Sequence, residues 1–290
     1  MTPESLATTA AARSGTQAIE RALAIMGAFD SQRTVCSATQ LAAELHLPLS
    51  TTHRIAQALA QAGLLEQGGA RGSRRRYRLG PEALRLGRLA EQQFGLDRIS
   101  AELADLALRT QTTVDLACLS RNYALVVAGS SVDGDGTPFL RLALHSTALG
   151  KVLLAWPSRT AGMLDDPRHL QTLGPLVAHT SATITETEEL REELHVVREN
   201  GYAVNDGESA NGVRTLAVPV LDPSGHARYA LAARATPELI SNRRLDEFLQ
   251  QLRASARTLA LQLLPPVSAS GPSSLPRPQR GCGCYPAEGP

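Results

Sequence analysis

The strongest constraint on the fold lies in residues 37–63, where two short helical patterns are separated by a proline. Apolar residues at i, i+3, i+4 and i+7 predict an amphipathic helix that begins after Ser37, a residue type that caps helix N-termini. Pro48 disfavours helical geometry at Leu47 and ends this helix. A second helix is predicted from about Leu49 or Ser50 up to Gly63. The apolar positions are Ala38, Leu41, Ala42 and Leu45 in the first helix, and Ile55, Ala58, Leu59 and Ala62 in the second.

A basic, glycine-rich hairpin is predicted directly after the second helix. Strand-like runs at residues 64–67 and 76–79 flank the loop Gly-Gly-Ala-Arg-Gly-Ser. A further helix is predicted from Thr16 to about Phe29. Three helices and a hairpin in this order form a winged helix-turn-helix, in which the second short helix reads base edges in the major groove of DNA. The polar stripe opposite the apolar one suits that role; it consists of Ser50, Arg54, Gln57 and Gln61.

The predicted DNA contacts lie on this second helix and on the hairpin, which we call the wing. They are Ser50, Thr51, His53, Arg54 and Gln57 on the helix, and Arg74, Arg75 and Arg76 on the wing. Residues 1–95 hold eleven arginines and seven acidic residues, a balance of +4, whereas residues 96–290 hold eighteen basic and twenty-one acidic residues, a balance of −3. A basic first half indicates a polyanionic partner such as double-stranded DNA. A solvated arginine-rich loop is the alternative that composition leaves open.

The chain divides into five predicted segments. Residues 1–15 form a disordered arm, 16–80 the winged helix-turn-helix, 81–95 a linker helix, 96–264 an effector-binding domain and 265–290 a disordered tail rich in Pro, Ser and Gly. Pro81 suits the first position of the linker helix. Its apolar stripe of Leu84, Leu86, Leu89 and Ala90 either forms a dimer seam or packs on its own domain.

The second half alternates helices and strands in an order typical of an antiparallel sheet. Helices are predicted at residues 99–109, 148–156, 188–199 and 241–264. A β-hairpin is predicted from alternation around Val114 and residues 124–127, and further strands at 139–144, 202–205, 215–221 and 227–234. The predicted fold class is therefore α+β: an N-terminal winged helix-turn-helix, a linker helix and a C-terminal α/β effector domain with an antiparallel sheet.

Several ordered motifs across both halves resemble the IclR-type transcriptional regulators. In the first half these are Gln-Ala-Ile-Glu-Arg-Ala-Leu at 17–23, Leu-Ser-Thr-Thr-His-Arg at 49–54 and Tyr-Arg-Leu-Gly at 77–80. In the second half they are Leu-His-Ser-Thr-Ala-Leu-Gly-Lys at 144–151, Gly-Tyr-Ala-Val-Asn-Asp-Gly-Glu at 201–208 and Gly-Val-Arg-Thr-Leu-Ala-Val-Pro-Val at 212–220. The resemblance covers residues 16–264.

This resemblance implies a ligand-responsive regulator that controls a catabolic or metabolic operon, as a repressor or an activator. Such proteins bind palindromic promoter sites as homodimers or homotetramers and respond to small organic acids. The corresponding effector positions are Ala148, Leu149, Asn205, Thr215, Ala232 and Arg234. The chain departs from the family pattern at Asn205, where an acidic residue is frequent, and at Ala232 and Arg234, where small hydroxyl residues are frequent.

The residues at the effector positions also suggest an anion independently of the resemblance. Backbone N–H groups at the start of a helix near Ala148 favour negative charge. An inward-facing Arg234 suits a carboxylate, whereas a one-residue register slip points it to solvent. The sequence leaves both orientations open.

Enzyme and metal chemistry find little support in the sequence. The stretch Gly-Glu-Ser-Ala-Asn-Gly at 207–212 is one residue too long for a G-x-S-x-G nucleophile elbow and is interpreted as a turn. The seven histidines show no HExxH spacing, and Cys282 and Cys284 make a poor zinc site. Lys151, the only lysine, is assigned a structural or capping role. We therefore expect no enzyme activity, metal or cofactor; the alternative is a small-molecule-binding protein or hydrolase that uses the winged helix for protein contacts.

The cysteine usage and the N-terminal composition predict a cytoplasmic protein. Four cysteines, two of them in helical or strand-like segments, make a disulfide framework improbable. The first twelve residues lack the pattern of a signal peptide, and no apolar run approaches the ~20 residues that span a membrane.

Overall fold

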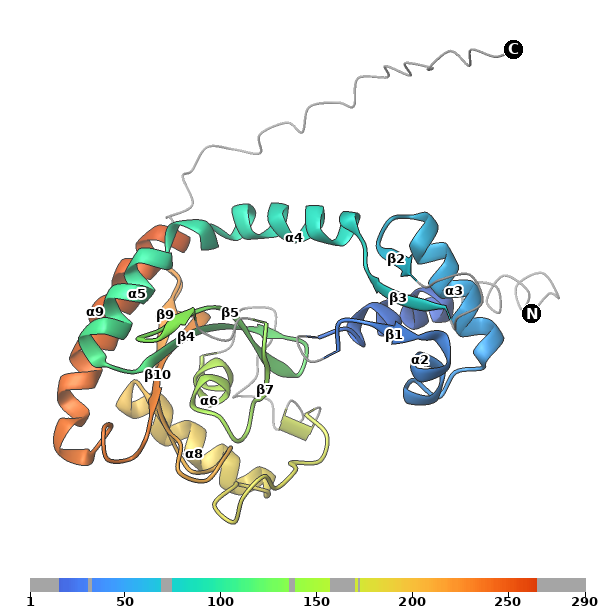
Figure 1. Ribbon diagram of the computed structural model, residues 1–290. Helices are drawn as coiled ribbons and strands as arrows, with labels where there is room; N and C mark the ends of the chain where they lie inside the picture. Colours follow the sequence, from blue (N-terminus) through green and yellow to red (C-terminus); the bar gives the residue numbers. More distant parts are fainter. Residues whose placement is uncertain are drawn as a thin grey trace, which may run out of the picture.

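The computed structural model describes residues 16–30, 33–68, 75–135, 139–156, 170–171 and 173–264. A small N-terminal part of helices and short strands is joined through the long helix α4 (Pro81–Phe94) to a larger part built on one sheet (Figure 1). The predicted disordered arm, 1–15, and tail, 265–290, lie outside the described residues. The fold is α+β, as predicted.

Three helices form the N-terminal part: residues 16–27, α2 (Ala38–Glu44) and α3 (Leu49–Gln61). Ser37 caps α2 in a reciprocal capping box, since its hydroxyl accepts the Gln40 N–H at 3.2 Å while the Gln40 side chain accepts the Ser37 N–H at 2.8 Å. The helices pack on a small apolar core that includes Ile25, Leu41 and Tyr77. The predicted helix-turn-helix is confirmed.

Ser37→Ala is expected to cost about 1 kcal/mol of stability, because the backbone N–H of Gln40 in the first turn of α2 loses the Ser37 hydroxyl that accepts it. Urea unfolding followed by far-ultraviolet circular dichroism measures it. Ser50→Ala is the matched control, because Ser50 is exposed in the first turn of α3, and we expect a change within about 0.5 kcal/mol. Equal effects of the two changes would contradict the role of the capping box.

The buried stripe of α3 differs from the predicted one. Thr52 and Ala56 are buried and Ile55 and Leu59 are half-buried, whereas Ala58, expected in the core, is exposed, as is Ala62. The Thr52 hydroxyl donates to the Pro48 carbonyl at 3.2 Å. Because its hydroxyl is hydrogen-bonded within the helix, Thr52 can occupy a core position, although a pattern based on hydrophobic residues predicts other positions for the core.

The wing is part of a three-stranded sheet. Strands β2 (Leu65–Gly68) and β3 (Arg76–Leu79) pair antiparallel, and β1 (Cys36–Ser37) adds to the other edge of β3. Because β1 is only two residues long, it shows no alternating pattern from which it could be predicted in the sequence. The loop between β2 and β3, residues 69–74, lies outside the described part.

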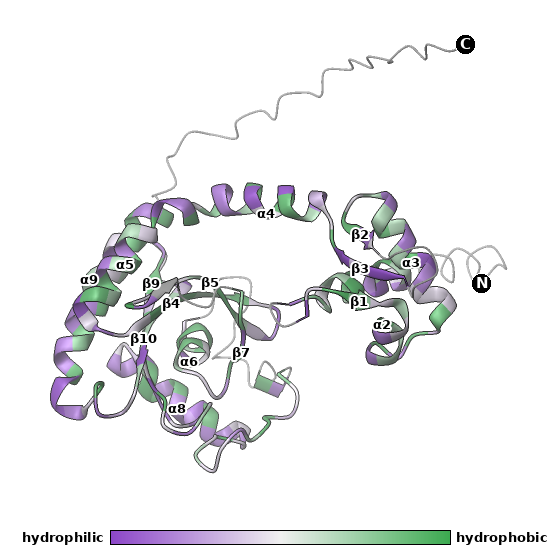
Figure 2. Ribbon diagram, in the orientation of Figure 1, coloured by the Kyte–Doolittle hydropathy of each residue, from purple (hydrophilic) through white to green (hydrophobic). Residues whose placement is uncertain are grey.

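Helix α4 buries none of its residues. Leu84, Leu86, Leu89 and Phe94 are all exposed, Leu84 to 66%. Figure 2 shows green, hydrophobic segments alternating with purple, hydrophilic ones along α4. The alternative in which this stripe packs on its own domain is therefore wrong, and the stripe is uncovered in the single chain. Gly95 ends α4 at φ 70°, a left-handed conformation that glycine adopts without strain.

The larger part is a sheet with helices on both faces. Its strand order is β6-β5-β4-β10-β9-β8, with β7 paired to β5. Helices α5 (Ser100–Thr110) and α9 (Leu245–Leu263) cover one face, and α6 (Ala148–Ala155) and α8 (Thr187–Asn200) cover the other. The strands are β4 (Thr113–Ser120), β5 (Tyr123–Ser131), β6 (Gly134–Asp135), β7 (Arg141–Ala143), β8 (Ala203–Asp206), β9 (Arg214–Leu221) and β10 (Ala227–Ala235).

Most element boundaries follow the sequence patterns, but β6 was not predicted and β5 extends to Ser131, beyond the predicted residues 124–127. The strand predicted at 139–144 is only three residues long, because Phe139 has φ 66° and interrupts the extended backbone. The last helix begins at Leu245, after a 3-10 turn at Asn242–Arg244.

Candidate DNA interface and effector site

The outer face of α3 presents polar side chains where a recognition helix meets base edges. Ser50, Arg54 and Gln57 are exposed, and Thr51 and His53 are half-buried. Pro48 precedes the helix directly, and Arg54 lies in the second turn of α3. Arginine and glutamine at such positions can make bidentate hydrogen bonds to guanine and adenine.

The wing lies beside this helix face. Arg75 Nη1 is 3.0 Å from His53 Nε2, and because arginine only donates, the histidine nitrogen accepts. Arg76 is exposed on β3. Arg78 is partly neutralised by Glu66, whose carboxylate is 2.8 Å away. Of the three predicted wing residues, the structure thus brings Arg75 to the recognition helix, whereas Arg76 lies on the face of β3 opposite the buried Tyr77 and Arg74 lies outside the described residues.

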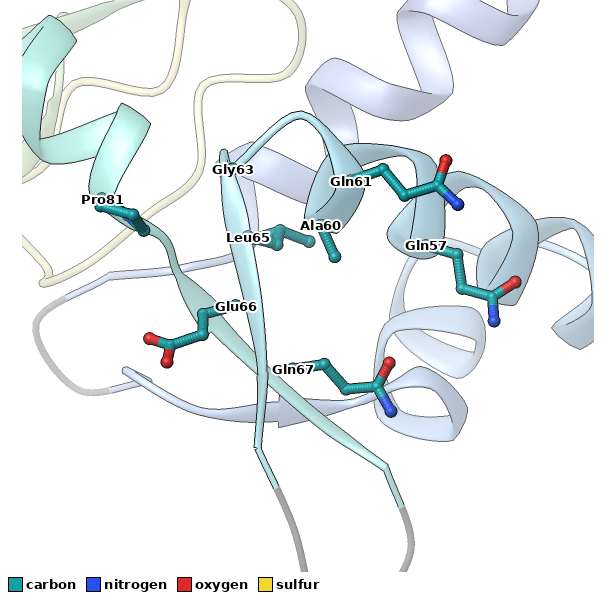
Figure 3. A pocket seen from close by; sticks show the side chains of 8 residues that line it. All are labelled: Gln57, Ala60, Gln61, Gly63, Leu65, Glu66, Gln67 and Pro81. Atoms are coloured by element: carbon teal, nitrogen blue, oxygen red, sulfur yellow. The ribbon is translucent and has the colours of Figure 1, made fainter. Parts of the chain in front are cut away.

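A hollow of about 560 Å³ lies between α3 and β2 (Figure 3). Gln57 and Gln61 line it from the helix, and Gln67 and Glu66 from the strand. Gln67 was not among the predicted contacts. Alternation from the buried Leu65 places Gln67 on the side of β2 that faces α3, so the pattern was available in the sequence.

Three predicted effector residues form one row across the sheet. Asn205 pairs with Thr215, and Thr215 pairs with Arg234, on β8, β9 and β10. Ala232, one pleat away, belongs to the core on the α6 side, so alternate residues place Arg234 on that face too. Ala148 and Leu149 are buried in the same core at the start of α6. The six predicted positions therefore share the layer between sheet and α6.

Arg234 does not project freely from this layer. Its Nε lies 3.3 Å from Oδ2 of Asp115, a buried carboxylate on β4 that the sequence analysis missed. Burial raises the pKa of Asp115, and the Arg234 charge opposes that shift. Oδ1 of Asp115 has no hydrogen-bond partner in the described part of the chain. A carboxylate ligand at Arg234 would therefore compete with Asp115.

Asn205 shapes the turn that follows β8. Its side-chain amide donates to Ser209 Oγ at 2.6 Å, and its oxygen accepts the Glu208 N–H at 2.8 Å. Ser209 thus lies in a turn between β8 and β9 and not on a strand-to-helix elbow, as predicted. This arrangement gives no support to a hydrolase nucleophile at Ser209.

The loop before α6 has a capped helix start and one unsatisfied hydroxyl. Thr147 Oγ1 accepts the Gly150 N–H at 3.1 Å and donates to the Ala143 carbonyl at 2.6 Å, which ties β7 to the helix. Ser146 is fully buried, and its hydroxyl has no partner among the described residues. Such an orphan hydroxyl beside helix-start donors suits a polar ligand atom.

Lys151 joins three elements below this loop. Its ammonium, 1% exposed, lies 2.8 Å from Glu193 on α8 and 2.7 Å from Glu208 in the turn after β8. Burial raises the pKa of Glu208, and the lysine charge opposes this. Lys151 has the structural role that its position predicts.

The described part of the chain holds no cluster of metal ligands and no membrane-spanning helix. In that part, no three or more His, Cys, Asp and Glu side chains gather as a metal site would require. Cys282 and Cys284 lie outside it. No helix of the described residues is long and apolar enough to span a bilayer.

These features together define a winged helix-turn-helix transcriptional regulator with a separate effector-binding part. Residues 18–69 match the IclR helix-turn-helix domain, and residues 96–261 match the family described as bacterial transcriptional regulator IclR C-terminal. The chain belongs to the IclR family of transcriptional regulators.

Individual relatives agree with this assignment. The regulator BhcR of Paracoccus denitrificans is 30% identical over 87% of this chain and 88% of its own, and XynR of Escherichia coli is 27% identical over 85% and 97%. A crystal structure of a candidate IclR regulator from Silicibacter sp. TM1040 has a TM-score of 0.73 at 27% identity and covers 86% of this chain and 98% of its own. An IclR homologue from Microbacterium hydrocarbonoxydans, complexed with 4-hydroxybenzoate, shares the fold, with a TM-score of 0.67 at 23% identity over 85% and 98%. The curated relatives are named as regulators and not as enzymes.

Proposed function

We propose that the protein controls a catabolic or metabolic operon by binding a palindromic promoter site, and that a small organic acid modulates this binding. The observation that carries the proposal is the exposed polar face of α3 beside Arg75 of the wing. In this proposal residues 16–80 bind DNA, 81–95 link and 96–264 bind the effector. Chromosomal DNA as partner places the protein in the cytoplasm.

A homo-oligomer, dimer or tetramer, is part of the proposal. Two recognition helices on a two-fold axis match a palindrome. The uncovered α4 leucines, together with Ile19 and Leu23, which are exposed to 62% and 53%, offer the apolar surface that a second copy would bury.

The proposed effector is a mono- or dicarboxylate, bound by Arg234 and by hydrogen bonds from Thr215 and the loop before α6. The two oxygens of a carboxylate match the fork of a guanidinium. The 4-hydroxybenzoate complex of a structural neighbour supports this ligand class.

The DNA test starts from genomic fragments selected by the full chain, followed by mobility-shift titration. We expect specific fragments to bind at least ~10³-fold more tightly than random DNA at fixed salt. Binding that is equally weak for all fragments would contradict the proposed function.

The effector test compares two substitutions with opposite expected results. Arg234→Ala should weaken binding of the best carboxylate roughly tenfold or more, because a charged hydrogen bond is lost. Asp115→Asn should strengthen it, because the competing carboxylate is removed. Calorimetry with a panel of carboxylates measures both changes. If neither substitution alters the affinity, Arg234 is not the effector's partner.

A further inference from the structure

A second cavity lies between the N-terminal part and the outer edge of the large sheet. It has a volume of about 810 Å³, within the range of small-molecule sites. Phe29 and Leu79 line it from the N-terminal part, and Tyr123, Phe139 and Arg141 line it from β5, β7 and the residue run between them. Figure 1 shows the two parts facing each other below α4.

The lining of this cavity is unusual for this chain. The whole sequence has four Phe, five Tyr and one Trp, and three of these aromatic residues, Phe29, Tyr123 and Phe139, gather here. Leu79 and Phe139 are exposed to 50% and 62%, so the single chain leaves apolar surface open on both walls. Such a pair of walls suits a flat apolar body such as an aromatic ring.

Arg141 supplies the charge beside these rings. Its guanidinium lies 5.3 Å from the centre of the Tyr123 ring, and Nη1 donates to the carbonyl of Gly27 at 3.2 Å. Gly27 ends the helix over residues 16–27, where carbonyls lack helical partners and a cation is favoured. The hydrogen bond to Gly27 uses one of the five guanidinium donors, so Arg141 can bind a further acceptor.

We propose that this cavity binds a small aromatic monocarboxylate, with the ring between the two apolar walls and the carboxylate on Arg141. A carboxylate matches the planar fork of the guanidinium. Arg78 also lines the cavity but is paired with Glu66, and Asp30 disfavours a ligand with two negative charges. The site is distinct from the effector row, because β5 and β4 lie between β7 and the β10 strand that carries Arg234.

A ligand here acts on the contact between the two parts. A carboxylate on the remaining donors of Arg141 lies next to the hydrogen bond from Arg141 to the Gly27 carbonyl, which joins β7 to the first helix. The strand β7 leads directly into the loop before α6, and Thr147 bonds back to Ala143. Occupation of the cavity therefore couples to the proposed effector site through this short connection.

The test is calorimetry of the full chain with 2-naphthoate as probe. Arg234→Ala/Asp115→Asn serves as the background, since it removes the effector arginine without leaving Asp115 as an unpaired buried carboxylate. We expect this protein to bind one 2-naphthoate per chain. Adding Arg141→Ala should weaken binding roughly tenfold or more, since a hydrogen bond to a charged group is lost.

Two further variants sharpen the result. Leu79→Glu places a negative charge in the wall from the N-terminal side and should likewise weaken binding roughly tenfold or more; Leu79 is exposed, so the fold tolerates the change. Arg253→Ala is the matched control. Like Arg141, Arg253 donates to a backbone carbonyl at the end of a helix, here that of Asn200 in α8, but both of these residues belong to the larger part of the molecule. It should leave binding unchanged. Absence of binding in the background protein, or unchanged binding after Arg141→Ala and Leu79→Glu, would overturn the proposal; neither outcome depends on whether the protein binds DNA.

Discussion

Lys151→Met is expected to destabilise the protein by about 3–5 kcal/mol, because it leaves Glu208 buried without its cation. The lysine side chain is 1% exposed and its ammonium is bonded to two carboxylates, so water does not take the place of the missing ammonium beside Glu208. Urea unfolding followed by circular dichroism measures the loss. The exposed Arg85–Glu82 pair on α4 provides the control, since Arg85→Met should cost less than about 1 kcal/mol.

The loss in Lys151→Met should depend on pH. Burial already raises the pKa of Glu208, and removal of the lysine charge that opposes this shift raises it further. A carboxyl whose pKa is higher in the folded than in the unfolded state stabilises the fold below its unfolded pKa and loses that contribution as the pH rises through its folded pKa. The destabilisation should therefore be greatest near neutral pH and shrink as the pH falls and Glu208 takes up a proton.

A second substitution tests the same pair. Lys151→Met/Glu208→Gln removes both charges and should recover a large part of the stability, since a neutral amide is far less costly to bury than an unpaired carboxylate. Equal stabilities of the single and double variants would show that Lys151 acts through packing alone.

Arg54→Ala is expected to weaken specific DNA binding by about 1–3 kcal/mol, because a base contact near the start of the recognition helix is lost. Mobility-shift titrations on a selected site and on random DNA measure it. The change should fall on the selected site and alter its base preference, while random DNA is affected much less. Wild-type affinity in Arg54→Ala would contradict the recognition-helix assignment.

Arg75→Ala should behave differently from Arg54→Ala. A wing residue that contacts phosphate contributes to all sequences, so binding should weaken on both DNAs and the salt slope should fall by about 1. Arg253→Ala, which removes a positive charge from α9 in the larger part, is the control for general loss of positive charge. The two arginines thus separate base recognition from phosphate binding.

The helix-turn-helix could be predicted from the sequence because its determinants are local. Ser37 and Gln40 are three residues apart, and Pro48 and Gly63 limit α3 at either end. The exposed face of α3 followed from the same spacing. The buried face was only partly predicted, since Thr52 satisfies its own hydroxyl inside the helix and takes a place that hydrophobicity gave to Ala58.

The effector layer was predicted in part, and for a different reason. The family resemblance supplied the six positions, and the strand pairing aligned Asn205, Thr215 and Arg234 in one row. Neither Asp115 nor the unsatisfied Ser146 hydroxyl follows from any pattern. Alternation along a strand predicts which of its residues share a face of the sheet. It does not predict which other strand pairs with that strand.

What the sequence determined by itself is the longer helices and strands, their order, the polar face of α3 and the family. The tertiary structure alone decided which distant groups meet: Arg234 with Asp115 across 119 residues, Lys151 with Glu208 across 57, and Arg141 with Gly27 across 114. Helices and caps depend on contacts within a few residues, which periodicity records. Ion pairs between strands and parts depend on sheet order and packing, and these are set by burial of the whole chain and leave no mark in local spacing.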